Sequence, residues 1–211
     1  DLKLPAAELV FRDGAVLSTR DPAKRIEVAK ISEFRRRRVI AGVGYRGRNP
    51  EGKATCPFAA QFCEVEVDRR TGEIRVVRFL GAHERGRVMN RMTYDNQVYG
   101  GIVFGIGLGL TERRVLDRRQ TGKMCNLSWH DYKIPTAMDV PADIVSLPID
   151  LPAPEANAIG AKGLGEPVTI PTAGAIANAI YDATGLRMTD SPITPSGLVE
   201  RLAAAGRGER I

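Results

Sequence analysis

Apolar and polar residues alternate most regularly over residues 58–67 and 73–81. A period of two places one face of each segment against a core, so both segments are predicted to be β-strands. The sequence between them, Asp68-Arg-Arg-Thr-Gly72, is short and ends in glycine. Strands joined in this way pair with each other, and we therefore expect an antiparallel hairpin in the middle of the chain.

Longer apolar segments predict helices in the second half of the chain. Residues 94–110 are apolar with glycines spaced along them, which favours a helix packed closely against a neighbour over a nucleotide-binding loop. Residues 172–184 form a helix pattern that begins after Pro171 and ends at Gly185. A last short helix is expected over residues 196–204.

The first 38 residues predict a linker and surface arm. Within them, residues 9–11 and 15–17 suit a small hairpin, and residues 28–34 suit a short charged helix. Residues 39–45 follow and are apolar enough for a strand.

A second hairpin is predicted from residues 111–116 and 123–129. Together these elements predict an α+β fold with mixed or antiparallel sheets and packed helices. We expect residues 39–204 to form the main domain and residues 205–211 to be a frayed tail.

Composition limits the classes of function. At 211 residues and 43% hydrophobic content, the chain can bury one core or two small ones. No apolar run suits a membrane span and no signal-peptide pattern is present, so we expect a soluble protein. The net charge of +6 and the run Arg35–Arg38 raise a nucleic-acid hypothesis. With 6% aromatic residues and no binding motif, a solvated or subunit-facing cluster is the better interpretation.

The cysteines and histidines show no metal-ligand spacing. Cys56, Cys63 and Cys125 form no C-x-x-C pair and are odd in number, so we expect reduced and mostly buried thiols rather than a zinc site, an iron–sulfur cluster or a disulfide framework. This indicates the cytoplasm, with the periplasm as an alternative. His83 and His130 are far apart in sequence and are expected to be structural hydrogen-bonding residues. No protein side chain is predicted to ligate a metal.

A glycine-rich loop near the C-terminal end carries the candidate chemistry. It reads Gly160-Ala161-Lys162-Gly163-Leu164-Gly165-Glu166-Pro167. Glycines let backbone N–H groups approach an anion, and Lys162 adds a positive charge beside the carboxylate of Glu166. On local chemistry alone, a glycine turn that caps a helix, with Glu166 improving its dipole, explains the same residues. The order of residues fits neither a phosphate loop nor a dinucleotide fingerprint.

The whole phrase, followed by Ala175-Ile-Ala-Asn-Ala-Ile-Tyr-Asp-Ala-Thr-Gly185, resembles the C-terminal signature of the molybdenum hydroxylases, the xanthine dehydrogenase and aldehyde oxidase family. Other blocks resemble the same family in the same order, from about residue 42 to about residue 199. They lie at residues 63–68 with 71–77, 82–90, 96–109, 126–136 and 139–141. The chain departs from commoner family versions at Glu84, where Asp is frequent, and at Arg91, where Pro often follows the asparagine.

The resemblance implies roles for particular residues. Glu166 would be the general base, and Gln97 would hydrogen-bond the pterin of the molybdenum cofactor. The loop residues would also hold this cofactor, in its plain or cytosine dinucleotide form: Gly160, Ala161, Lys162, Gly163, Leu164 and Gly165. The implied fold is that of the C-terminal molybdopterin-binding domain of xanthine dehydrogenase-like enzymes.

The implied activity is oxidative hydroxylation, with water, of an electron-poor carbon in a small molecule. Purines, N-heteroaromatics, aldehydes and aromatic thioesters stay open as substrates. Family molybdenum subunits are longer, so we expect a split subunit or a fragment that works in a hetero-oligomer with the upstream half of the molybdenum subunit, an iron–sulfur subunit and an FAD-containing flavin subunit. Two alternatives are a non-catalytic assembly fragment of such a complex and a basic nucleic-acid-binding module.

Overall fold

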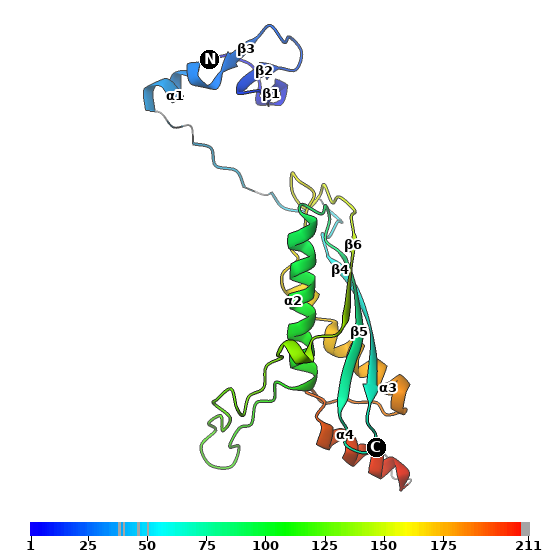
Figure 1. The fold of residues 1–211 in the computed structure, drawn as a ribbon. Helices are drawn as coiled ribbons and strands as arrows, with labels where there is room; N and C mark the ends of the chain where they lie inside the picture. Colours follow the sequence, from blue (N-terminus) through cyan, green and yellow to red (C-terminus); the bar gives the residue numbers. More distant parts are fainter. Residues whose placement is uncertain (38, 40, 46, 50, 208–211) are drawn as a thin grey trace. The chain divides into compact units, whose positions relative to one another are not determined.

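The computed structural model describes residues 1–37, 39, 41–45, 47–49 and 51–207 (Figure 1). The contacts divide the chain into two units, Asp1–Gly47 and Arg48–Ile211. Each unit is described by itself. Of the sequence predictions, Arg38 of the arginine run, Ile40 of the predicted strand and tail residues 208–211 lie outside the described residues.

The N-terminal unit is built on a three-stranded antiparallel sheet in the order β1-β2-β3. The elements are η1 (Ala6–Glu8), β1 (Leu9–Arg12), β2 (Ala15–Ser18), β3 (Arg25–Glu27), η2 (Val28–Lys30) and α1 (Ser32–Arg37). The predicted small hairpin is confirmed: Asp13 and Gly14 both have positive φ, as a tight two-residue hairpin turn requires. The predicted helix is replaced by η2 and α1, and β3 was not foreseen.

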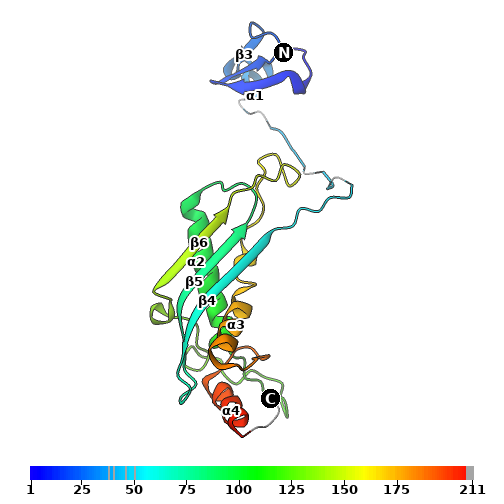
Figure 2. The ribbon, with the colours of Figure 1, turned by 90° about the vertical axis from the view of Figure 1, so that its right-hand side faces the viewer.

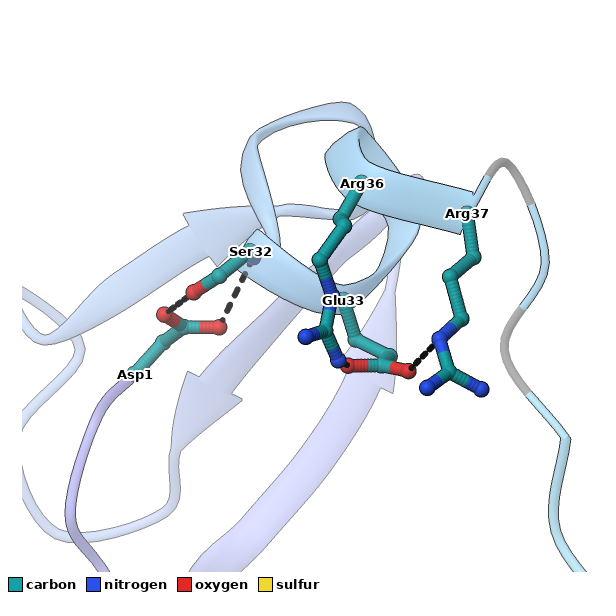
Figure 3. Close-up of polar contacts among 5 residues, drawn as sticks. All are labelled: Asp1, Ser32, Glu33, Arg36 and Arg37. Carbon is teal, nitrogen blue, oxygen red and sulfur yellow. Dashed lines mark hydrogen bonds and ion pairs between the residues drawn. The ribbon is translucent and has the colours of Figure 1, made fainter.

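The arginine run at the end of α1 is engaged with a carboxylate of the same helix. Glu33 receives ion pairs from Arg36 at 2.6 Å and from Arg37 at 3.1 Å, and all three side chains are exposed (Figure 3). The start of the helix is held by Asp1, whose carboxylate accepts hydrogen bonds from the backbone N–H and hydroxyl of Ser32. The described arginines of the run therefore form a solvent-exposed cluster, in agreement with the solvated cluster expected from the sequence.

The second unit contains a three-stranded sheet in the order β4-β5-β6. The elements are β4 (Phe58–Val67), β5 (Ile74–Glu84), α2 (Arg91–Leu110), η3 (Ala137–Asp139), β6 (Asp143–Ile149), η4 (Glu166–Val168), α3 (Thr172–Thr184) and α4 (Pro195–Gly206). β4 and β5 form the predicted antiparallel hairpin, and β6 pairs with β5 in parallel. Figure 2 shows the three strands side by side, with α2 behind them.

The core lies between one face of this sheet and the helices. The buried cluster is drawn from β5, α2, α3 and α4, with Phe79, Val98, Ile102, Ile176, Ile180 and Leu198 among its largest members. Glycines on α2 bring the helices close together. A Cβ at Gly101 would lie 2.0 Å from Val168, and one at Gly105 would lie 2.2 Å from Thr172. The predicted role of the glycines in close helix packing is confirmed, and Val168 and Thr172 pack in the space that they leave.

Some predicted elements differ in the structure. Val39 and residues 41–45 form no strand and are exposed, because no described segment pairs with them. The second hairpin is reduced to one bridge, between Leu116 and Met124. Cys56 and Cys125 are exposed and Cys63 is half-buried, so the prediction of mostly buried thiols is wrong, although all three are free. α4 continues to Gly206, into the predicted tail.

No helix in the described part of the chain is long and apolar enough to cross a membrane.

Candidate functional site

The glycine-rich loop is attached to the end of β5. The N–H of Arg87 donates to the carbonyl of Gly160 at 2.8 Å, and the N–H of Lys162 donates to the carbonyl of Arg85 at 2.7 Å. Between these two bonds lies Gly86, which has φ +69°, and a Cβ there would come within 2.3 Å of the Gly160 carbonyl. Only glycine fits this close approach without strain, so Gly86 fixes the loop against the strand.

The loop and helix α2 border one cleft. α2 begins at its cap Asn90, whose side chain accepts from the N–H of Thr93 at 3.0 Å. Two turns further on, the side-chain amide of Gln97 donates to the carbonyl of Gly165 at 3.3 Å. The cleft has a volume of about 310 Å³. Its lining consists of Arg85, Arg87, Met89, Asn90, Thr93, Tyr94, Gln97, Ala161, Lys162, Leu164 and Gly165.

The cleft thus brings together five of the eight site residues expected from the sequence: Gln97, Ala161, Lys162, Leu164 and Gly165. The other three lie outside its lining. Gly160 is buried where the loop meets β5, and Gly163 and Glu166 are exposed. Glu166 follows Gly165 directly and is the first residue of η4, so its backbone continues from the lining of the cleft.

Lys162 does not offer a free positive charge beside Glu166. Its ammonium is 2.6 Å from the carboxylate of Glu84 and donates to the carbonyl of Cys56 at 3.0 Å. Burial alone would raise the pKa of Glu84, but hydrogen bonds from Lys162 and from the N–H of Gly86 outweigh it, and the pKa of Glu84 lies below its usual range. The pair therefore fastens the loop to β5. The longer glutamate, where the family often has aspartate, is the residue that reaches Lys162.

The segment that carries Glu166 rests on a buried polar network. The amide of Gln61 on β4 donates to the carbonyl of Val168 at 2.6 Å, and its oxygen accepts from the hydroxyl of Thr172 at 2.7 Å. The same amide nitrogen lies 3.1 Å from Nε2 of His83. Burial, assisted by the charge of Arg85, lowers the pKa of His83, so its neutral Nε2 can accept from Gln61. These bonds hold η4 and the start of α3 against the sheet.

Sequence reasoning foresaw the structural role of His83 but missed Gln61 and Arg85. Gln61 is a polar residue at an inward position of an alternating strand, which is a weak signal before its partners are known. Arg85 is 2% exposed, lines the cleft, and has no acceptor for Nε and Nη1 within the described residues. Burial lowers the pKa of its guanidinium.

Arg91 is the first residue of α2. Its guanidinium donates to the Asp95 carboxylate at 2.7 Å and to the carbonyl of Ser146 at 3.1 Å. The first bond is an ion pair within the helix, and the second joins α2 to β6. Arg91 thus links the start of α2 to the sheet through its side chain.

Metal ligation by side chains is not indicated in the part of the chain that the structure describes. No group of three or more His, Cys, Asp or Glu residues there is placed to hold a metal ion.

The chain belongs to the molybdopterin cofactor-binding domain family, which it matches over residues 1–141. This range includes the whole N-terminal unit, Arg85 and Gln97, and it ends before Glu166. The chain is 36% identical over 149 residues to the xanthine dehydrogenase molybdenum-binding subunit of Escherichia coli, covering 71% of this chain and 19% of that protein. It is 39% identical over 145 residues to the aldehyde oxidoreductase molybdenum-binding subunit PaoC of Escherichia coli, covering 69% and 20%.

A solved structure supports the same conclusion about the fold. Quinoline 2-oxidoreductase from Pseudomonas putida superposes with a TM-score of 0.74 at 26% sequence identity, covering 96% of this chain and 26% of that chain. The expected α+β fold of a molybdenum-binding domain is therefore confirmed. The chain spans about a fifth of the length of the two curated relatives.

Proposed function

We propose that this chain forms the C-terminal part of the molybdenum subunit of a hydroxylase, and that Glu166 is its general base. The observation that carries the proposal is the hydrogen bond between Gln97 and Gly165, which are 68 residues apart. It closes one cleft between α2 and the glycine loop. These are the two segments whose sequences resemble cofactor-binding segments of the molybdenum hydroxylases.

The residues of the cleft suit an anionic pterin cofactor. Molybdopterin carries a phosphate group, and its dinucleotide form carries a diphosphate. The N–H groups of Gly163, Leu164 and Gly165 donate no hydrogen bond to described residues, and a Cβ at either glycine would meet nothing within 4 Å. The described lining contains three cationic residues and no carboxylate. Free backbone donors, open space and positive charge are what such a group requires.

The proposed roles follow from the positions of the residues. Gln97 and the loop would orient the pterin, and Lys162 would hold the loop in place through Glu84. When bound, the molybdenum cofactor supplies a metal that accepts two electrons from the substrate and makes water more acidic. Glu166 is exposed, directly follows Gly165 of the cleft lining, and would take the proton from the water-derived hydroxyl that attacks the substrate carbon. The network of Gln61 with Val168 and Thr172 holds the backbone turn that carries Glu166.

The open face of the sheet supports a role within a larger assembly. Phe58 and Phe62 on β4 and Leu147 on β6 point away from the helices and are 65%, 65% and 49% exposed. An apolar sheet face of this kind is typical of a surface covered by another part of a protein. We propose that the upstream part of the molybdenum subunit covers it, in a hetero-oligomer with an iron–sulfur subunit and a flavin subunit in the cytoplasm.

Replacement of Glu166 by Gln tests the catalytic role. The amide keeps the size of the side chain but cannot accept the proton, so turnover should fall by about 10²–10⁴-fold while molybdenum content is unchanged. Turnover would be followed with quinoline, xanthine and benzaldehyde and an electron-accepting dye. Glu200→Gln, an exposed carboxylate on α4, is the matched control and should keep wild-type turnover.

A molybdenum-loaded Glu166→Gln assembly with near-wild-type turnover would refute the assignment of the general base. It would leave this chain as a non-catalytic part of the cofactor site.

A further inference from the structure

Arg85 is a buried cation whose own chain gives it no acceptor at two of its nitrogen atoms. The residue is 2% exposed, and its Nε and Nη1 atoms are fully buried without a hydrogen-bond partner among the described residues. Charged groups are buried in proteins when they are paired or when they bind a charged ligand. Arg85 therefore needs a physical explanation that the fold alone does not provide.

The strand explains why the side chain is inside. Phe79, Gly81 and His83 are buried on the helix-facing side of β5, and Arg85 continues this alternation by one more step. Glu84 belongs to the opposite side. Its carboxylate is bound to Lys162 at 2.6 Å and to the N–H of Gly86 at 2.8 Å. The nearest carboxylate in sequence is thus committed to another cation, and Arg85 is left without a hydrogen-bonded counter-ion.

The position of Arg85 distinguishes it from other buried polar atoms without partners. In the described part of the chain these are His83 Nδ1, Asp95 Oδ1 and Ser146 Oγ. None of these residues lines the cleft of Gln97 and the glycine loop, whereas Arg85 does. Arg87 and Lys162 line the same cleft, but Arg87 is exposed and Lys162 is paired. Arg85 is the cation there that combines burial with unused donors.

We propose that the Arg85 guanidinium forms an oxyanion subsite that binds a phosphate group of the cofactor held in this cleft. The inference rests on the proposed function for the identity of the cofactor. The guanidinium keeps its N–H donors in one fixed plane, and those on Nε and Nη1, which have no acceptor among the described residues, can each donate to an oxygen of an anion. The energy lost by burying a guanidinium without acceptors at these two atoms is recovered when the anion binds. The subsite is therefore less stable empty than filled.

The subsite can be tested with inorganic pyrophosphate as the probe. The assembly containing the full chain would be prepared from cells unable to make the cofactor and titrated by calorimetry and phosphorus NMR. Arg85→Gln should weaken pyrophosphate binding on the order of tenfold to a hundredfold, as expected for losing a charge-assisted pair. Arg85→Lys should recover part of the loss. Arg69→Gln removes an exposed arginine from the β4–β5 turn and should bind like wild type.

Stability in the absence of anion separates a binding role from a structural one. If Arg85 is kept for a ligand, then Arg85→Gln should raise the Tm of the cofactor-free assembly, on the order of 2–4 °C, because an unpaired buried charge is removed. If the arginine supports the fold, the same substitution should lower the Tm, and that result would overturn the proposal. Saturating pyrophosphate should raise the Tm of wild type more than that of the variant.

Different experiments would refute the Arg85 subsite and the proposed function. Wild-type assembly that binds no pyrophosphate, or binds it equally well as Arg85→Gln, would refute the subsite even if the loaded protein contains molybdenum. If pyrophosphate binds through Arg85 but no molybdenum or pterin is found in protein from cofactor-producing cells, the oxyanion subsite stands and the assignment of the cofactor is wrong.

Discussion

The two sides of the glycine loop differ in how their polar groups are satisfied. Behind the loop, the amide of Gln61 uses both its oxygen and its nitrogen, in bonds to Thr172 and Val168. In front of it, the cleft holds a guanidinium on Arg85 with buried donors that no described residue accepts. The first arrangement stabilises a single position of η4 and α3. The second arrangement lowers stability. Natural proteins keep such destabilising arrangements mainly at functional sites.

This contrast separates the part of the site that is fully packed from the part that we propose to bind a ligand. The packed side is complete within this chain, because glycines on α2 admit Val168 and Thr172 and the network joins them to the sheet. The cleft side, under the proposal made for Arg85, is complete only with an added anion. Substitutions on the packed side should therefore change stability, whereas substitution of Arg85 in the cleft should change binding with a small or opposite effect on stability.

The largest expected effect on stability is that of Gly105→Ala. The added Cβ would lie 2.2 Å from Thr172 Cβ, so α2 and α3 would have to separate. We expect a loss of about 2 kcal/mol or more in the free energy of unfolding, measured by urea denaturation. Gly100→Ala is the matched control on the same helix, since its Cβ would meet nothing within 4 Å. It should stabilise by about 0.5–1 kcal/mol through helix propensity. Equal effects at both positions would contradict the packing account.

A smaller effect is expected from Lys162→Met, which leaves the carboxylate of Glu84 without its cation. The two side chains are only 13% and 14% exposed, and we expect a loss of about 1–2 kcal/mol near neutral pH. Lys133→Met breaks the more exposed pair with Asp139 and should cost less than about 0.5 kcal/mol. If the two substitutions cost the same, the Lys162–Glu84 pair does not anchor the loop.

The pH dependence gives a second test of the same pair. The pKa of Glu84 is lowered in the folded chain, so its contribution to stability is complete above its unfolded pKa of about 4.3 and is lost as pH falls through the folded value. Lys162→Met removes a principal cause of the lowering. The difference in Tm between wild type and this variant should therefore shrink as pH is reduced from 7 to 3.

Local pattern predicted the elements of the second unit that are set by local rules. β4 and α3 have the predicted bounds. The alternation of β4, and the proline and glycine that flank α3, are properties of the segments themselves. β6 was missed. Its sequence contains Pro148, which argues against a central strand, and the strand lies at the edge of the sheet. The apolar residues 41–45 were assigned to a strand, but a strand needs a partner, and none is present among the described residues.

The site residues that belong to a recognisable sequence motif were predicted, whereas those revealed only by tertiary contacts were missed. The glycine loop and Gln97 came from family resemblance, and the structure brings them to one cleft. Lys162 was expected to add a positive charge beside Glu166, but it pairs with Glu84. This pairing depends on the approach of β5, which is distant in sequence. Whether Arg85 is paired likewise depends on every neighbour around it. No periodicity in the sequence distinguishes an unpaired buried arginine from a solvated one.

The most direct test of the central claim is the content of molybdenum and pterin per copy of this chain in the native assembly. The assembly would be purified from cells able to make the cofactor, and its other polypeptides would be identified. We predict near-stoichiometric molybdenum and pterin, together with an upstream molybdenum polypeptide. A stable assembly without molybdenum or pterin would contradict the account and leave the glycine loop as a structural turn between β6 and α3.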